Sequence, residues 1–145
     1  MNTLIPIDEV FLILTGKISS MINRTILRAF AAEKLDVTTE QWTVLACLWK
    51  EDKVTQQFLC NMTSKDKPSM THLIDNLEKR NLVTRVSDPK DRRINLIHLT
   101  KNGIQLQSKA TEVIQRVIEK TLRDINEAEL EMSKNILKKI ISNIE

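Results

Sequence analysis

The stretch from residue 55 to residue 80 constrains the fold most, because it reads as two short helices joined by a polar turn. Four apolar residues of the second helix recur at i, i+3, i+4 and i+7: Met70, Leu73, Ile74 and Leu77. At 3.6 residues per turn, this spacing places all four on one face. We therefore expect the second helix to pack on a core through that face and to expose the other.

The turn before this helix carries the signals of a helix start. Ser64 or Asp66 can act as the N-cap, since either side chain can accept a hydrogen bond from a free backbone N–H of the first turn. Pro68 then falls inside that first turn, where its missing N–H costs nothing. The pattern predicts a helix that starts here rather than one that breaks.

The face opposite the apolar one is polar and can both donate and accept hydrogen bonds. With its two flanking positions it comprises Pro68, His72, Asn76, Lys79, Ser69 and Thr71. Cations surround it in the sequence: Lys65, Lys67, Lys79, Arg80, Arg85, Lys90, Arg92 and Arg93. This helix alone fits an ordinary solvated face and a nucleic-acid-binding face equally well, so the residues downstream must decide between them.

Two short β-branched runs follow at residues 82–86 and 94–99, and both are predicted strands. The loop between them, residues 87–93, is polar, cationic and longer than a tight turn needs. A solvated loop would also explain these charges. A charged hairpin directly after a helix-turn-helix is a narrower pattern, called a wing because it can reach the groove beside the helix. The sequence therefore favours a winged helix-turn-helix.

Long amphipathic helices are predicted at both ends of the chain, which contains only 2 Gly and 3 Pro. The first covers residues 7–32 and is too long for the core of one small unit. A helix from residue 101 to about residue 123 carries two apolar stripes and needs two partners. A capping box at residues 126–129 opens a last helix whose only evident neighbour is the first. A homodimer with interleaved terminal helices is the economical arrangement.

Composition bounds the class of protein. The 145 residues are 41% hydrophobic, enough for one domain with a real core, and the net charge of +3 permits an anionic partner. No apolar run could span a bilayer and no leader pattern is present, so we expect a cytoplasmic protein without a membrane partner. Cys47 and Cys60 lack neighbours at ligand spacing, so we expect neither metal nor cofactor and favour core thiols over redox sensors.

A capping box at residues 38–41 opens a helix that contains both tryptophans of the chain, Trp42 and Trp49. They lie seven residues apart and therefore on nearly one face. Two roles stay open for them. They are core anchors, which is the favoured role, or they line a cavity for an aromatic ligand.

The order of these parts resembles the MarR family of bacterial winged-helix regulators over nearly the whole chain. The segments that carry the resemblance are Thr38-Thr-Glu-Gln-Trp42, Leu73-Ile-Asp-Asn-Leu-Glu-Lys-Arg-Asn-Leu-Val83, Asp88-Pro-Lys-Asp-Arg-Arg93 and Leu99-Thr-Lys-Asn-Gly103. The most specific element is the Asp-x-Arg of the wing, Asp91 and Arg93. The segment Asp66-Lys-Pro-Ser-Met70 is similar to the start of the recognition helix in one branch of the family.

The resemblance implies a mainly α fold with a small β-hairpin wing, as a single domain over residues 1–145. Residues 1–34 and 101–145 would be dimerisation helices, and residues 38–99 the winged-helix DNA-binding lobe. The implied function is that of a homodimeric transcriptional regulator that binds a pseudo-palindromic duplex operator. The implied mode is a repressor that a small effector of the aromatic-acid type releases. Such proteins are not enzymes.

The resemblance also selects site residues. Candidates on the recognition helix and the turn before it are Ser69, Thr71 and His72 for base edges, Lys65, Lys67 and Lys79 for phosphates, and Pro68 and Asn76 beside them. Candidates on the wing are Lys90, Asp91, Arg92 and Arg93, where Arg93 suits a narrow minor groove and Asp91 could orient its guanidinium. Candidates for an effector pocket are Phe11, Trp42 and Trp49.

Three positions depart from the family pattern. His72 stands where some relatives carry an arginine, and an imidazole cannot reproduce the bidentate contact that an arginine makes with guanine. Asn81 stands where a glycine is common, and asparagine tolerates the left-handed backbone. The first helix contains no cysteine, which disfavours a peroxide sensor of the kind known in the family.

Two other classes of function compete with a regulator. A winged-helix adaptor for another protein would bind duplexes weakly and without sequence preference. An enzyme is the poorest alternative, because neither His72 nor His98 has an evident nucleophile or carboxylate partner in the sequence. The sequence also contains no glycine-rich phosphate loop.

Overall fold

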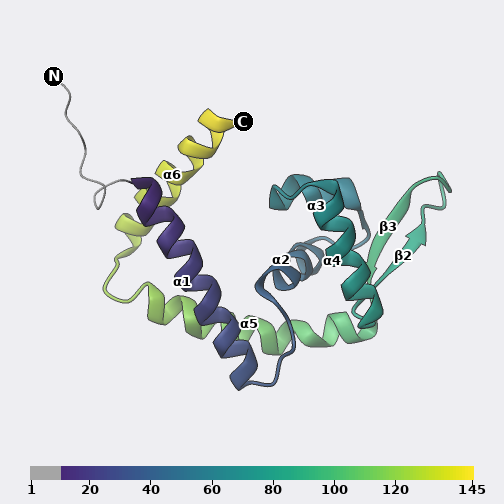
Figure 1. The fold of residues 1–145 in the computed structure, drawn as a ribbon, viewed down its shortest axis with the longest axis horizontal. Coiled ribbons are helices and arrows are strands. Elements are labelled where there is room, and N and C mark those ends of the chain that lie inside the picture. Colours follow the sequence, from purple (N-terminus) through teal and green to yellow (C-terminus); the bar gives the residue numbers. More distant parts are fainter. Residues whose placement is uncertain (1–10) are drawn as a thin grey trace.

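The computed structural model describes residues 11–145 (Figure 1). The elements, in chain order, are α1 (Phe11–Ala32), α2 (Thr39–Lys50), β1 (Val54–Thr55), α3 (Gln56–Thr63), α4 (Lys67–Lys79), β2 (Val83–Ser87), β3 (Asn95–Leu99), α5 (Lys101–Thr121) and α6 (Glu127–Ile144). Figure 1 shows α5 running beneath two groups of elements, with α1 and α6 over one end and α2, α3, α4 and the strands over the other. This arrangement is the predicted fold class, a winged helix-turn-helix with long terminal helices.

The strands form one antiparallel sheet in the order β1-β3-β2, so that β2 lies at an edge. β2 pairs with β3 from Val83 opposite Leu99 to Ser87 opposite Asn95. These two strands and their loop, residues 83–99, are the wing. Its strands lie within one residue of the predicted bounds. The sequence pattern does not predict β1, because two residues are too few to show an alternation and its partner β3 is remote in the chain.

Side-chain caps begin five of the helices. Each of these residues accepts a hydrogen bond from the backbone N–H three positions later: Thr38, Thr55, Asp66, Thr100 and Asn126. At Thr38 and Asn126 the reciprocal bond completes a capping box, as predicted. Of the two predicted caps for α4, the structure selects Asp66, while Ser64 ends α3 with a φ of 54°.

The core lies where α2, α3, α4 and the sheet meet, and it continues between α1 and α5. Its fully buried side chains include Val44, Leu45, Leu48, Leu59, Met70, Ile74, Leu77 and Ile97. All four residues of the predicted apolar face of α4 are buried, which confirms that prediction. Full burial of one such side chain is worth about 1.5–3 kcal/mol, so this face holds α4 firmly in place.

The terminal helices are packed unevenly. α1 contacts α5, and both helices contribute buried side chains, Ile26 and Phe30 from α1 and Val113 and Val117 from α5. In contrast, α6 contains no buried residue. The large exposed apolar side chains of α1 and α6 include Phe11, Ile13, Leu14, Ile18, Met21, Leu27, Met132, Ile136, Leu137, Ile141 and Ile144. The predicted helix at residues 7–32 agrees with α1 from Phe11 onward, and residues 7–10 lie outside the described residues.

Both cysteines are free thiols, Cys60 buried and Cys47 half-buried. Burial raises the pKa of the Cys47 thiol, and the nearby charge of Lys50 opposes this effect. A raised pKa lowers the thiolate fraction, which disfavours a reactive role for Cys47. Among residues 11–145, no helix combines the length and apolar character that crossing a bilayer requires.

Candidate nucleic-acid interface

The first turn of α4 is presented to solvent. Asp66 Oδ1 accepts a hydrogen bond from the Ser69 backbone N–H at 2.8 Å, and hydrogen bonds from Ser69 lower the pKa of the Asp66 carboxyl. Lys67, Pro68 and Ser69 are all exposed. The left-handed backbone of Ser64 turns the chain between α3 and α4. The side chains of Lys67 and Ser69 at the start of α4 are therefore accessible from solvent.

Thr71 helps to join α4 to α3. Its hydroxyl donates to the Lys67 carbonyl oxygen at 2.9 Å and accepts from Gln56 Nε2 at 2.6 Å. Gln56 also donates to the Lys67 carbonyl oxygen at 3.3 Å. Sequence reasoning misses Gln56, because a side-chain contact between two helices leaves no periodic signal. Thr71 is half-buried and already has two partners, whereas Ser69 beside it remains exposed.

His72 and Asn76 form a pair one helical turn apart. Asn76 Nδ2 lies 3.2 Å from His72 Nε2, a contact that the histidine can accept in its Nδ1-protonated tautomer. His72 is exposed and Asn76 is half-buried. Lys79, in the last turn of α4, is also exposed. The polar face predicted for this helix is therefore present, with an imidazole near its centre.

The cations near α4 divide into paired and unpaired groups. Lys65 Nζ lies 3.5 Å from Glu40 Oε1, and Arg80 Nη1 donates to Gln41 Oε1 at 2.9 Å. Arg85 forms ion pairs with two carboxylates of α4. Among residues 11–145, the exposed cations of this region without an ion pair are Lys67, Lys79, Lys90 and Arg92. Fewer cations are therefore free to bind an anion than the sequence suggests.

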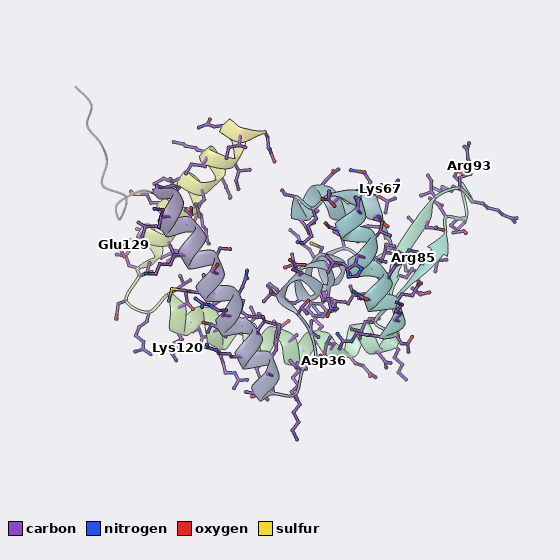
Figure 2. All side chains as sticks on the ribbon, viewed as in Figure 1. Asp36, Lys67, Arg85, Arg93, Lys120 and Glu129 are labelled. Atoms are coloured by element: carbon purple, nitrogen blue, oxygen red, sulfur yellow. The ribbon has the colours of Figure 1, made fainter. Side chains whose placement is uncertain are left out.

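The wing tip holds Arg93 in a defined orientation. Asp91 Oδ1 accepts from the Arg93 backbone N–H at 3.0 Å and from its Nε at 3.1 Å, and Asp91 Oδ2 accepts from Nη2 at 3.2 Å. The side-chain hydrogen bond from Arg93, followed by the backbone one, lowers the pKa of the Asp91 carboxyl. The Arg93 side chain is nevertheless 90% exposed. Figure 2 shows Lys67 and Arg93 at the same end of the lobe, away from α5.

The three candidates for an effector pocket do not all lie together. Trp42 and Trp49 both line a cavity of about 260 Å³ between α2 and α5. Trp49 Nε1 donates to the Gly103 carbonyl oxygen at 2.9 Å, and both tryptophans pack against the core. Phe11 is 46% exposed at the start of α1 and is not among the residues that line this cavity. Both roles proposed for the tryptophans therefore remain compatible with their positions.

The Asp66 cap predicts a contribution to stability that depends on pH. The folded state depresses the pKa of Asp66, so this contribution is present above the ordinary aspartate pKa and is lost as the pH falls through the folded-state value. In Asp66→Asn, we expect the unfolding free energy to fall less steeply as the pH decreases. Urea titrations from about pH 6 to about pH 2 measure this dependence. The matched control is Asp124→Asn, in the exposed turn between α5 and α6, and an equal change there would contradict the assignment.

The chain is similar to a known protein family and to solved structures. The family model for the MarR family matches residues 37–94, which run from the start of α2 into the wing. The S. aureus MepR–DNA complex is similar in structure, with a TM-score of 0.84 and 27% identity over 92% of this chain and 98% of that chain. Over 92% of its length, the chain therefore shares its fold with a protein solved on DNA.

Two curated relatives extend this result. The organic hydroperoxide resistance transcriptional regulator of Bacillus subtilis (strain 168) is 30% identical over 81 residues, 56% of this chain and 55% of the relative. The chain thus spans about half the length of that relative. The HTH-type transcriptional regulator SarZ of Staphylococcus haemolyticus (strain JCSC1435) is 30% identical over 111 residues, 77% of this chain and 74% of SarZ. On these matches, the chain belongs to the MarR family of winged helix-turn-helix transcriptional regulators.

Proposed function

We propose that this chain is a homodimeric transcriptional regulator that binds a pseudo-palindromic DNA duplex, and that it is a repressor released by a small effector. The observation that carries the proposal is the common direction of two exposed groups: the start of α4 and the wing-tip Arg93 lie at one end of the lobe (Figure 2). A duplex that accepts α4 in its major groove can accept the wing in the adjacent minor groove. This role places the protein in the cytoplasm, with the bacterial chromosome.

The apolar surface of the terminal helices supports the dimer. α6 buries no residue within its own chain and exposes five large apolar side chains, from Met132 to Ile144. A contiguous apolar surface of this kind favours a protein partner over solvent. Two-fold pairing would then set the two recognition helices about 34 Å apart, one turn of the duplex. Residues 101–145 and the first helix are the proposed dimerisation part, and residues 38–99 the DNA-binding lobe.

The residue roles follow from exposure and existing partners. Ser69 and His72 are the proposed base-contacting groups, since both are exposed on α4. Lys65 and Thr71 already have intramolecular partners, so we assign them a supporting role at the same surface. The proposed phosphate-binding and groove-binding residues are Lys67, Lys79, Lys90, Arg92 and Arg93, with Pro68 and Asn76 shaping the contact and Asp91 orienting Arg93.

A small aromatic acid is the proposed class of effector. The cavity that Trp42 and Trp49 line is the proposed seat, because it lies between α2 of the lobe and α5, which runs beneath both groups of elements (Figure 1). A ligand there could shift one lobe against the dimer and so change the spacing of the recognition helices. The test is to select duplexes from a random pool and to repeat the selection with aromatic acids and with oxidants. Loss of the selected motif identifies the trigger.

Arg93→Ala tests the DNA-binding surface itself. We expect it to lower the affinity for the selected duplex about 10- to 100-fold, because one well-placed groove contact is worth about 1–3 kcal/mol. Binding by the unmodified chain should weaken with salt, with a log–log slope of about −0.9 per phosphate neutralised. Fluorescence anisotropy at several salt concentrations measures both quantities.

The control for Arg93→Ala is Lys120→Ala, which removes the same unit charge from the far part of the molecule (Figure 2). This control should bind as the unmodified chain does. Affinity that is independent of salt, or equal effects of the two substitutions, would contradict the proposed surface.

A further inference from the structure

Arg85 occupies an inward position of β2. Successive side chains of a strand point to opposite faces, so Arg85 shares a face with Val83, which is buried. An arginine in such a place needs partners, because an unpaired charge facing a core is costly. The Arg85 side chain is only 23% exposed. It is therefore unlike the wing-tip Arg93, which is almost entirely in solvent.

Two carboxylates of α4 supply the partners. Arg85 Nη2 lies 2.7 Å from Asp75 Oδ1, and Nη1 lies 2.9 Å from Glu78 Oε1. The other oxygen of Glu78 accepts from the Arg85 backbone N–H at 3.0 Å. β2 lies at the edge of the sheet, so Glu78 provides this amide with an acceptor where no further strand does. One arginine thus fixes the strand to the helix through its side chain and its backbone.

These contacts differ from those that hold the base of the wing. At the base, Thr100 Oγ1 donates to the Asn81 carbonyl oxygen at 2.6 Å, and the Leu99 backbone N–H donates to Asp52 Oδ1 at 2.9 Å. Among the described residues, the hydrogen bonds and ion pairs that join the wing to α4 are all made by Arg85. Without them, the wing would stay attached through its base, through the pairing of β3 with β1 and through the buried Val83 and Ile97. The edge strand β2 could then shift against the recognition helix.

We propose that Arg85 is a positioning residue, which fixes the wing against α4 so that Arg93 meets the minor groove at a set distance from the major-groove contacts. This inference rests on the proposed DNA-binding function. Figure 2 shows Arg93 at the tip of the wing and Arg85 beside α4, and the strand register places Arg85 midway along β2. Any coupling between the two arginines must therefore pass through the outer part of the hairpin. The planar guanidinium suits the task, because its donors reach both carboxylates at once.

A direct phosphate contact by Arg85 makes a different prediction. In that case, neutralising Glu78 would release the arginine toward the duplex and remove a repelling charge, and binding would tighten. If Arg85 positions the wing, neutralising Glu78 loosens the wing and binding weakens. The two roles therefore differ in the sign of the effect.

The test is a double-mutant cycle on the duplex that the unmodified chain selects from a random pool. The variants are Arg93→Ala, Arg85→Met and the two together. We expect Arg93→Ala to cost tenfold or more by itself but less than about threefold in the Arg85→Met background, since residues that act through one structure are not additive. Equal losses in both backgrounds would overturn the inference, and thermal unfolding of each variant checks that it is folded.

Glu78→Gln gives the second measurement and replaces Arg85→Met in the cycle if that variant does not fold. Glu78→Gln should weaken binding at least threefold, although it raises the net charge by one. The size of this loss should depend on the sequence of the duplex flanks that the wing contacts. Glu112→Gln, on an exposed part of α5, is the charge-matched control. Tighter binding by Glu78→Gln would overturn this inference but leave the proposed function in place. If the unmodified chain selects no duplex, the proposed function falls, and the inference falls with it.

Discussion

Replacing Leu137 and Ile141 together by glutamate is expected to leave the protein monomeric and to lower its operator affinity about a thousandfold or more, toward non-specific binding. The two side chains lie one turn apart on α6 and are 46% and 54% exposed in the protomer. Two charges on this surface would have to lose water when the second chain packs against it. A monomer can engage only one half-site, so it loses the second recognition helix as well as the apolar contact.

Sedimentation measures the mass of this variant, and anisotropy on the full operator measures its affinity. Circular dichroism should also report a loss of helix, since an 18-residue helix without tertiary packing is only marginally stable. The matched control is Asn135→Glu with Ser142→Glu, which places two charges on the opposite side of the same helix. A dimer with intact affinity in the Leu137 and Ile141 variant would refute the assigned interface.

Gly103→Ala is expected to destabilise the protein by about 3 kcal/mol or more, because the new methyl group has no room. Gly103 lies in the first turn of α5, where a Cβ would overlap the Leu82 carbonyl oxygen and come within 3.2 Å of Leu99 Cδ2. The obstacle is mainly backbone, which cannot rotate away as a flexible side chain could. The carbonyl oxygen of Gly103 itself accepts a hydrogen bond from Trp49 Nε1, so a shift of α5 would disturb that contact as well.

Gly16→Ala is the control for this substitution within the same chain. Nothing lies within 4 Å of a Cβ at Gly16, and the residue is inside the helix α1. Alanine there should stabilise the protein by about 0.5–1 kcal/mol, since it restricts the unfolded chain and suits a helix better. Urea unfolding at one fixed protomer concentration compares the two variants, because the stability of a dimer depends on concentration. Similar effects at the two glycines would contradict the close approach at Gly103.

Much of the site could be predicted because helix signals are local. The Asp66 cap, Pro68 in the first turn and the apolar face of α4 all depend on residues three or four positions apart. The left-handed backbone of Asn81 is also present, with a φ of 57°, at the position where the family resemblance implied it. Asp91 and Arg93 at the wing tip are only two positions apart in the chain, so their contact could be predicted as well.

Which cations have intramolecular partners could not be predicted in this way. In the sequence, Arg80 and Arg85 are two more positive charges beside a polar helix. In the structure, Arg80 contacts Gln41 of α2, and Arg85 is held by Asp75 and Glu78. Each of these contacts requires two elements to approach at a particular angle, and no periodicity encodes that approach. For the same reason, the sequence does not predict β1 or the contact of Gln56 with Thr71.

The amino-acid sequence by itself determined where the helices and the wing begin and end, and which face of each helix is apolar, because these properties follow from neighbours along the chain. Only the tertiary structure decided which charged groups are free to meet DNA and which hold the lobe together. An ion pair depends on distance in space. A half-buried arginine between two carboxylates becomes a structural support, whereas an exposed one beside a single aspartate stays available. For this reason Arg85 and Arg93, eight residues apart on one hairpin, have different proposed roles.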